Sequence, residues 1–437
     1  MLNRAIRLPH ATALVAGTII GASIFVQPSE ITSRMPSLAG TAAVWLTAGT
    51  LTFFGALVCA ELASALPRTG GVYVYLREAF SPALGFLWGW AMFWTMHSGI
   101  IAAIAVIVAR YTAYFVPLGD LATKGVAIGA IVLLSAVNYL GVRQGSRLQT
   151  LFTVGKVTAI AVMIGAGFAL GAPAGPGAAP PPAGGGVDDF LLAVAAGLFA
   201  FGGWHMVTYN AEETVDPERT IPRALMLGIL IVTACYLALN AVYFYLLPVA
   251  TVASSTRVAA DAADAVVGFG GGAAMSGVVV FSAFGALSGI VLAGPRVYYA
   301  MARDGLLFRW AGDAHPRFHT PHRAIALQAV WSSVLVATGT YHVLFTRVVY
   351  TEWIFFGLLA IALVRLRRRG VPRRYSVWGY PVVPIVFALA SAAVVVGQLV
   401  DEPVESATGL AFVVAGLPVY YLWTSWRRPG AARAEDS

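Results

Sequence analysis

The groups best placed to do chemistry in this sequence are backbone atoms inside two long apolar stretches. Gly17 and Gly21 lie near the middle of the first stretch, and Gly202 and Gly203 lie near the middle of the second. Small residues weaken a helix, and an interrupted helix exposes N–H groups at one new end and carbonyls at the other. The first attract an anion and the second a cation. Two adjacent breaks can therefore hold a small molecule that carries both charges.

Both breaks supply candidate binding atoms. The N–H groups of Ala22, Ser23 and Ile24 are expected to hold a carboxylate, and the carbonyls of Ile19, Phe199 and Ala200 an ammonium group. The other residues of the two breaks are expected to shape the pocket around the ligand: Gly21, Phe201, Gly202, Trp204 and His205. Two alternatives stay open. Gly17 and Gly21 also fit a close helix contact, and His205 also fits a hydrogen-bonded histidine of the core.

The composition requires a membrane. The chain has 437 residues, of which 59% are hydrophobic and 11% charged, with a mean hydropathy of +0.77. An average soluble domain is about a quarter charged, so this chain lacks the charges for a water-facing surface. The composition excludes a soluble enzyme, a disordered protein and a nucleic-acid binder, despite the net charge of +8.

Segments of about 20 apolar residues cross a bilayer as helices. By that rule the sequence predicts an all-α polytopic protein with twelve transmembrane helices, approximately 10–34, 40–66, 82–115, 124–142, 149–171, 189–212, 222–248, 272–302, 322–341, 343–365, 379–400 and 405–426. The two interrupted stretches are the first and the sixth. Interrupted helices at corresponding positions of two halves are typical of a transport site.

The arginines predict the orientation. They gather in the even-numbered connections, most densely at Arg365–Arg374, whereas the odd-numbered connections hold only Arg34, Lys124 and Arg257. The positive-inside rule then places both termini in the cytoplasm. Residues 172–188, rich in Pro and Gly, form an external linker, and residues 427–437 a cytoplasmic tail.

Charged or titratable groups inside a membrane are costly and suggest function. Lys156 lies about two turns into the fifth predicted helix, although a lysine there can also snorkel to the surface. Tyr236 and Asn240 share one face of the seventh helix. Glu61, Glu212 and Glu213 lie near the cytoplasmic edge and are expected to form ion pairs rather than to bind a ligand. The roles of His97, Arg347 and Glu352 stay open.

Motifs outside the apolar runs resemble the amino acid–polyamine–organocation superfamily of transporters. Within it, the chain is most similar to bacterial relatives of the L-type amino acid transporters, over about residues 10–426, which implies a location in a bacterial inner membrane. The motifs are Ala60-Glu61-Leu62-Ala63, Pro67-Arg68-Thr69-Gly70-Gly71, Glu212-Glu213-Thr214-Val215-Asp216-Pro217, Ile221-Pro222-Arg223 and Arg296-Val297-Tyr298-Tyr299.

The resemblance implies a LeuT-like fold. Residues 1–171 and 189–370 would be inverted repeats of five helices, broken near 21–23 and 201–204, and residues 371–426 would add two peripheral helices. It also implies alternating-access transport of small α-amino acids, with Phe199 as an aromatic gate. Lys156 matches a lysine that replaces a sodium ion in sodium-independent relatives, and Ser282, Ser288 and Tyr236 would lie beside it.

Several points stay open within this interpretation. The first break reads Gly21-Ala22-Ser23 where the family usually has Gly-Ser-Gly, and His205 stands where L-type transporters often have Asn, so the side-chain preference is not defined. Exchange or facilitated flux is favoured. The alternatives are a proton-coupled amino acid or polyamine transporter, and an amino acid sensor that does not transport.

Other classes of function and partner are not expected. An intramembrane enzyme is disfavoured because no His-Glu-x-x-His or Gly-x-Ser-x-Gly motif lies in an apolar segment. No cofactor, metal or nucleic acid is expected. The expected partners are the amino acid substrate and the lipid bilayer, and the chain is compatible with a monomer. A disulfide-linked heavy chain is not expected because Cys59 and Cys235 lie inside apolar runs.

Overall fold

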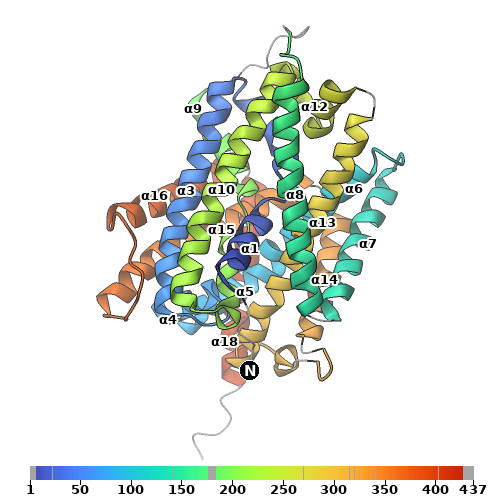
Figure 1. Ribbon diagram of the computed structural model, residues 1–437. Coiled ribbons are helices and arrows are strands. Elements are labelled where there is room, and N and C mark those ends of the chain that lie inside the picture. Colours follow the sequence, from blue (N-terminus) through green and yellow to red (C-terminus); the bar gives the residue numbers. More distant parts are fainter. Residues whose placement is uncertain are drawn as a thin grey trace, which may run out of the picture.

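The protein is described by a computed structural model that covers residues 6–21, 23–140, 142–175, 184–268, 270–313, 315–318, 320–339, 341–401 and 403–426, without the side chains of 142–150, 341–347, 349 and 426. Within these ranges the regular elements are all helices, and the one isolated β-bridge joins Ile6 to Thr214. Figure 1 shows a bundle of long helices lying roughly parallel to one another.

Most of the predicted membrane helices have direct counterparts. In the described part of the chain, nine segments are long and apolar enough to cross a bilayer: Leu38–Ala65 (α3), Pro82–Thr112 (α5, η2 and α6), Asp120–Tyr139 (α7), Leu151–Leu170 (most of α8, Val142–Leu170), Val187–Glu213 (α9 and η3), Pro217–Leu246 (α10), Gly271–Arg303 (α13), Val382–Asp401 (α16) and Pro403–Ser425 (α17 and α18). The chain is therefore a helical, multi-pass membrane protein.

The other three predicted spans are also helical, although they are not among these nine segments. The first consists of α1 (Leu8–Ile19), η1 (Ser23–Phe25) and α2 (Gln27–Arg34). The ninth is α14 (His322–Thr338) and the tenth is α15 (Tyr341–Arg368). The seventh predicted helix, 222–248, corresponds to α10, Pro217–Leu246, and both ends agree to within a few residues. Pro217 occupies the first helical position, where an N–H group has no partner in the helix.

The connections contain short helices that the hydropathy did not predict. They are α4 (Val72–Ala79), α11 (Val249–Ser254), α12 (Val258–Val267) and η4 (Arg309–Gly312). A π-helical turn, η2 (Met92–Met96), also interrupts the third predicted span between α5 (Pro82–Ala91) and α6 (His97–Thr112). None of these segments contains the 20 or so apolar residues on which the prediction depended.

The helix α1 lies in the middle of the bundle. It packs against α10 on one side and α8 on the other, and it also contacts η3 and α13 (Figure 1). The helices α3 and α10 run along each other, and α13 runs along α6 and α8. This arrangement encloses the two interrupted helices within the bundle.

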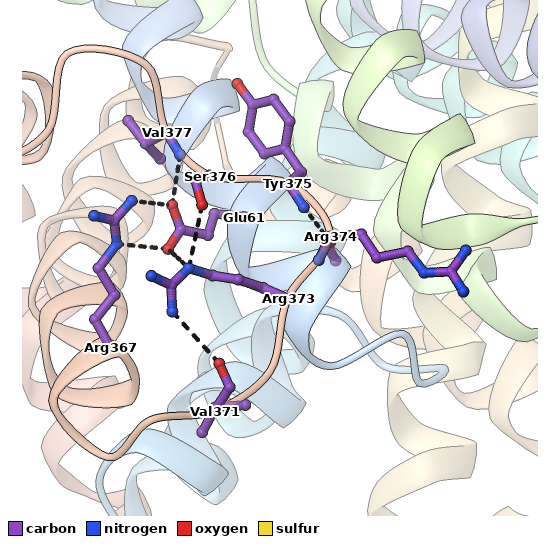
Figure 2. Close-up of polar contacts among 9 residues, drawn as sticks. Glu61, Arg367, Val371, Arg373, Arg374, Tyr375, Ser376 and Val377 are labelled. Atoms are coloured by element: carbon purple, nitrogen blue, oxygen red, sulfur yellow. Dashed lines mark hydrogen bonds and ion pairs between the residues drawn. The ribbon is translucent and has the colours of Figure 1, made fainter.

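One end of the bundle is rich in arginine, and we call it the arginine-rich end; it carries Arg303, Arg309, Arg323, Arg367 and Arg373. Here Glu61, at 2% exposure, lies near the end of α3. Its carboxylate accepts hydrogen bonds from Arg367 Nε and Nη2 at 2.6 and 2.5 Å, and it also pairs with Arg373 at 2.9 Å (Figure 2).

Backbone groups complete this cluster. The Val377 N–H donates to Glu61 at 2.6 Å (Figure 2). In addition, Ser64 Oγ accepts from the N–H groups of Arg374 and Tyr375. Arg374 then reaches Glu218 of α10 at 2.7 Å. The segment after α15 therefore fastens the ends of α3 and α10, and the expected ion pairing of Glu61 is confirmed.

Replacing Glu61 with Gln removes the charge that two arginines and a buried N–H group share. We expect the free energy of unfolding to fall by about 1–3 kcal/mol, because the buried donors lose a charged acceptor. The thermal unfolding midpoint of the purified protein measures this effect. The control is Glu218→Gln, which loses one pair with a largely exposed arginine and should cost less than about 1 kcal/mol. Equal shifts in the two variants would contradict the assignment.

Candidate functional site

The first break begins directly after Ile19. The backbone of Ile20 leaves the helical region, with φ −68° and ψ 78°, and helix resumes as the short η1 at Ser23. A methyl group added at Gly21 would lie 3.4 Å from the Ala286 Cβ, so α13 packs closely against the break. Ala22, a predicted binding residue, lies outside the described residues.

The second break follows Ala200. Phe201 closes α9 with φ −86° and ψ 0°, and the Gly202 N–H donates to the Phe199 carbonyl at 2.9 Å. Gly203 then takes a φ of +92°, which glycine adopts without strain, and η3 starts at Trp204. The left-handed backbone conformation of Gly203 therefore determines where the second half of this span begins.

The two breaks lie side by side. Thr18 Oγ1 lies 3.3 Å from the Gly203 carbonyl oxygen. The Tyr236 hydroxyl, from α10, lies 3.0 Å from the Ile19 carbonyl oxygen and 2.9 Å from that of Ala200. A hydroxyl has only one proton, so Tyr236 shares it between the last carbonyls of two half-helices. These are two of the three carbonyls that we predicted for an ammonium group.

Lys156 also serves the first break. Its side chain is fully buried, and Nζ donates to the carbonyls of Gly17 and Ile20 at 2.5 and 2.6 Å. The snorkelling alternative is wrong, because the ammonium group bonds inside the bundle. A positive charge at this position also complements the negative end of the α1 dipole.

The two serines that were predicted to lie beside Lys156 form no hydrogen bond with it in the described part of the chain. Ser282 and Ser288 are buried in α13, and neither hydroxyl has a hydrogen-bond partner in the described part of the chain. The two hydrogen bonds that Lys156 Nζ donates go to carbonyls at the end of α1 instead. The structure therefore brings Lys156 and Tyr236 to the break, but it shows no bond between Lys156 and either serine.

Donors are present on the other side of the first break. Ser23 and Ile24 are buried, and among the described residues their N–H groups have no acceptor outside their own short helix. N–H groups at a helix start are suited to an anion. Carbonyls and N–H groups thus face the break from its two ends, as a zwitterion requires.

His205 and Trp204 pack away into an aromatic cluster. The His205 ring lies 5.0–5.8 Å, centroid to centroid, from the rings of Trp88, Trp204, Tyr209 and Phe356. Its Nδ1 is buried with no hydrogen-bond partner among the described residues. The Phe201 ring instead packs on Trp45 and Tyr236. Phe199 is buried, and its role as a gate stays a prediction.

Two contacts, one on each side of the breaks, have partners that the sequence did not predict. The Tyr111 hydroxyl, from α6, donates to the Phe25 carbonyl at 2.7 Å. Arg296 of α13 pairs with Glu213, at the end of η3, at 3.1 Å, which confirms the expected ion pairing of Glu213 with a partner that was not predicted. Nothing marks Tyr111 in its apolar run. Arg296 has a signal that was not followed, because it is a charged residue inside the predicted span 272–302.

Other polar groups in the core have structural roles. His97 Nε2 lies 2.7 Å from the Ile290 carbonyl oxygen, which joins α6 to α13. Asn240 Nδ2 donates to the Tyr236 carbonyl within α10 at 2.8 Å. Glu352 is buried in α15, and the side chain of Arg347 lies outside the described residues. Cys59 and Cys235 are free thiols.

Comparisons with known proteins agree over nearly the full length. The family model described as "Amino acid permease" matches residues 6–423. The serine/threonine exchanger SteT of Bacillus subtilis is 32% identical over 96% of this chain and 97% of its own. The human b(0,+)-type amino acid transporter 1 is 29% identical over 98% of this chain and 89% of its own. The human cystine/glutamate transporter is 28% identical, over 97% and 86% respectively.

Changing Gly203 to Ala tests the geometry of the second break. An L-residue in the left-handed region costs about 1–2 kcal/mol, so the free energy of unfolding should fall by that amount. The matched control is Gly165→Ala in α8, where a new methyl group meets no atom within 4 Å. Removing a helical glycine there should stabilise by about 0.5–1 kcal/mol. Thermal unfolding should therefore shift in opposite directions, and a common direction would contradict the description of this break.

Proposed function

The chain belongs to the amino acid permease family, and on that premise we propose that it is a sodium-independent transporter of small α-amino acids that works by alternating access. The family and the relatives are membrane transporters rather than enzymes. The intramembrane-enzyme alternative is therefore dropped.

The contact of Lys156 with the first break carries the proposal of sodium independence. Its ammonium group already occupies two carbonyls at the end of α1, at 2.5 and 2.6 Å. A second cation about 4 Å away would meet a repulsion of roughly 4 kcal/mol at an effective dielectric constant of 20. A fixed charge at these carbonyls therefore does the work of a bound sodium ion and opposes its binding.

The substrate is proposed to lie between the two breaks. Its carboxylate would accept from the N–H groups of Ser23 and Ile24, with Ala22 completing the set. Its ammonium group would donate to the carbonyls of Ile19, Phe199 and Ala200, since a carbonyl oxygen can accept two hydrogen bonds. The wall around the substrate side chain would be completed by the other residues of the two breaks: Gly21, Phe201, Gly202, Trp204 and His205. Some of them would contact the substrate directly, and the others would position the residues that do.

Charge around the breaks favours a zwitterion over a polyamine. No Asp or Glu lies within residues 16–25 or 199–206. A substrate with two positive charges would therefore bury one of them without a carboxylate, which is costly. The proton-coupled polyamine alternative lacks a partner at this site for that reason.

Alternating access requires that contacts on each side of the breaks open in turn. On one side Tyr111 of α6 bonds to Phe25, and on the other Arg296 of α13 pairs with Glu213. In both cases one of the two broken spans is held by a helix of the proposed supporting group. We assign the moving group to spans 1, 2, 6 and 7, and the supporting group to spans 3, 4, 8 and 9, which follows the proposed inverted repeats 1–171 and 189–370. Residues 371–426 would lie at the periphery.

The proposed orientation places the arginine-rich end in the cytoplasm of a bacterium, with both termini on that side and the linker outside. Exchange is the favoured mode, and the name of the Bacillus subtilis relative, an exchanger, supports it. The amino acid sensor is kept as an outcome of the tests below.

Sodium independence is tested directly in proteoliposomes. Amino acids that raise the unfolding midpoint of the purified protein serve as candidate substrates. Counterflow of such an amino acid should keep its rate when choline replaces all sodium, because Lys156 holds the cation position. Loss of counterflow in choline would overturn the role of Lys156. Binding without any counterflow, in either medium, would identify a sensor.

Replacing Lys156 with Met tests the same residue. The variant leaves two buried carbonyls without their donors, each at a cost of about 1–3 kcal/mol. Counterflow should fall by a factor of about ten or more, or else become dependent on sodium. The chain has only one other lysine, Lys124, which is partly exposed at the start of α7. Lys124→Met is the matched control and should transport at the unaltered rate.

A further inference from the structure

A membrane-facing groove lies far from the breaks, at the arginine-rich end. It has a volume of about 640 Å³ and runs between α5, η2, α13 and α14, with η4 at its mouth. Its walls are almost entirely apolar and include Trp90, Trp94 and Trp331. The two indole N–H groups of Trp90 and Trp331 already donate to backbone carbonyls, so these rings present apolar faces to the groove.

The length of the groove matches one leaflet of a bilayer. Along α14 it extends from Arg323 to Trp331, which is about 12 Å at 1.5 Å per residue. Half of the hydrocarbon core measures about 15 Å. Leu327 and Val330 are exposed on its rim, so the groove opens sideways toward lipid rather than into the bundle. An acyl chain that runs along the membrane normal fits these dimensions.

The mouth of the groove carries positive charge. Residues 303–323 contain four arginines and two aspartates. Asp304 is engaged by Arg77, and Asp313 pairs with Arg323 at 3.1 Å, which leaves the other guanidinium donors of Arg323 available. Arg309 is exposed in η4, beside the lining residue Trp310. A ligand at this mouth therefore gains from a negative charge.

We propose that this groove binds one anionic phospholipid of the leaflet at the arginine-rich end. An acyl chain lies against the aromatic wall, and the phosphate contacts Arg309 and Arg323. A second copy of the chain is a poorer occupant, because a self-complementary contact would bring two positive mouths together. A zwitterionic lipid would gain little from the arginines.

Native mass spectrometry of the delipidated full-length protein tests this site. The probes are phosphatidylglycerol and phosphatidylcholine with the same acyl chains. We expect one phosphatidylglycerol to be retained in preference to phosphatidylcholine. Ala326→Trp fills the groove from an exposed lining position and should abolish the preference. Val334→Trp places the same ring on the same helix outside the groove and should leave the preference unchanged.

A charge variant keeps the proposal testable if the filled groove disturbs folding. Arg309→Gln should weaken the binding of phosphatidylglycerol about fivefold, the usual contribution of one basic residue near anionic lipid. Arg257→Gln, beside Tyr114 in another connection, should not weaken it. Equal retention of the two lipids by the wild-type protein would overturn the proposal. So would a dimer that Ala326→Trp dissociates, since a second copy would then fill the groove.

Discussion

The central constraint on this structure is that a backbone carbonyl inside a membrane needs a donor from within the protein. A continuous helix meets that need by itself, but α1 ends at Ile19 in the middle of the bundle. Two side chains from other helices supply the missing bonds. Lys156 bonds to the carbonyls of Gly17 and Ile20, and Tyr236 bonds to those of Ile19 and Ala200. The breaks can exist because α8 and α10 place these donors beside them.

The same constraint explains why the site stays open to a ligand. Tyr236 has one proton for two carbonyls, and the Gly21 N–H also donates to that of Ile19 at 2.6 Å, so the Ala200 carbonyl is the acceptor that is short of donors among the described residues. The N–H groups of Ser23 and Ile24 are free of acceptors outside their short helix within the described residues. The proposed zwitterionic substrate would supply what each side lacks, three donors from its ammonium group and two acceptor oxygens from its carboxylate. Its binding would complete a bonding pattern that the described part of the chain leaves incomplete.

Local sequence patterns predicted much of the fold and only part of the site. Apolar length was enough for the long helices, and the glycines near residues 21 and 203 lie where α1 and α9 end. Lys156 was identified because a charge in an apolar run is costly. The partners of Lys156 were predicted less well. Ser282 and Ser288 lie on a neighbouring helix, but spacing along a chain does not show toward which neighbour a long side chain turns.

Contacts across long separations could not be predicted from the sequence. Arg367 contacts Glu61 across 306 positions, and Arg296 contacts Glu213 across 83 positions. The arginine run was interpreted only as a signal of orientation. The structure adds that Arg367 and Arg373 also fasten the end of α3.

These contacts make the two sides of the breaks unequal. The side of Tyr111 is held by a hydrogen bond between neutral groups, which contributes about 0.5–1.5 kcal/mol. The side of Arg296 is held by a largely buried ion pair with two bonds to Glu213, at 3.1 and 3.2 Å, and bonds to charged groups contribute about 1.5–3 kcal/mol. In the proposed alternating access, opening toward the arginine-rich end would therefore cost more than opening toward the linker. In the proposed orientation, the empty transporter would open more readily to the outside.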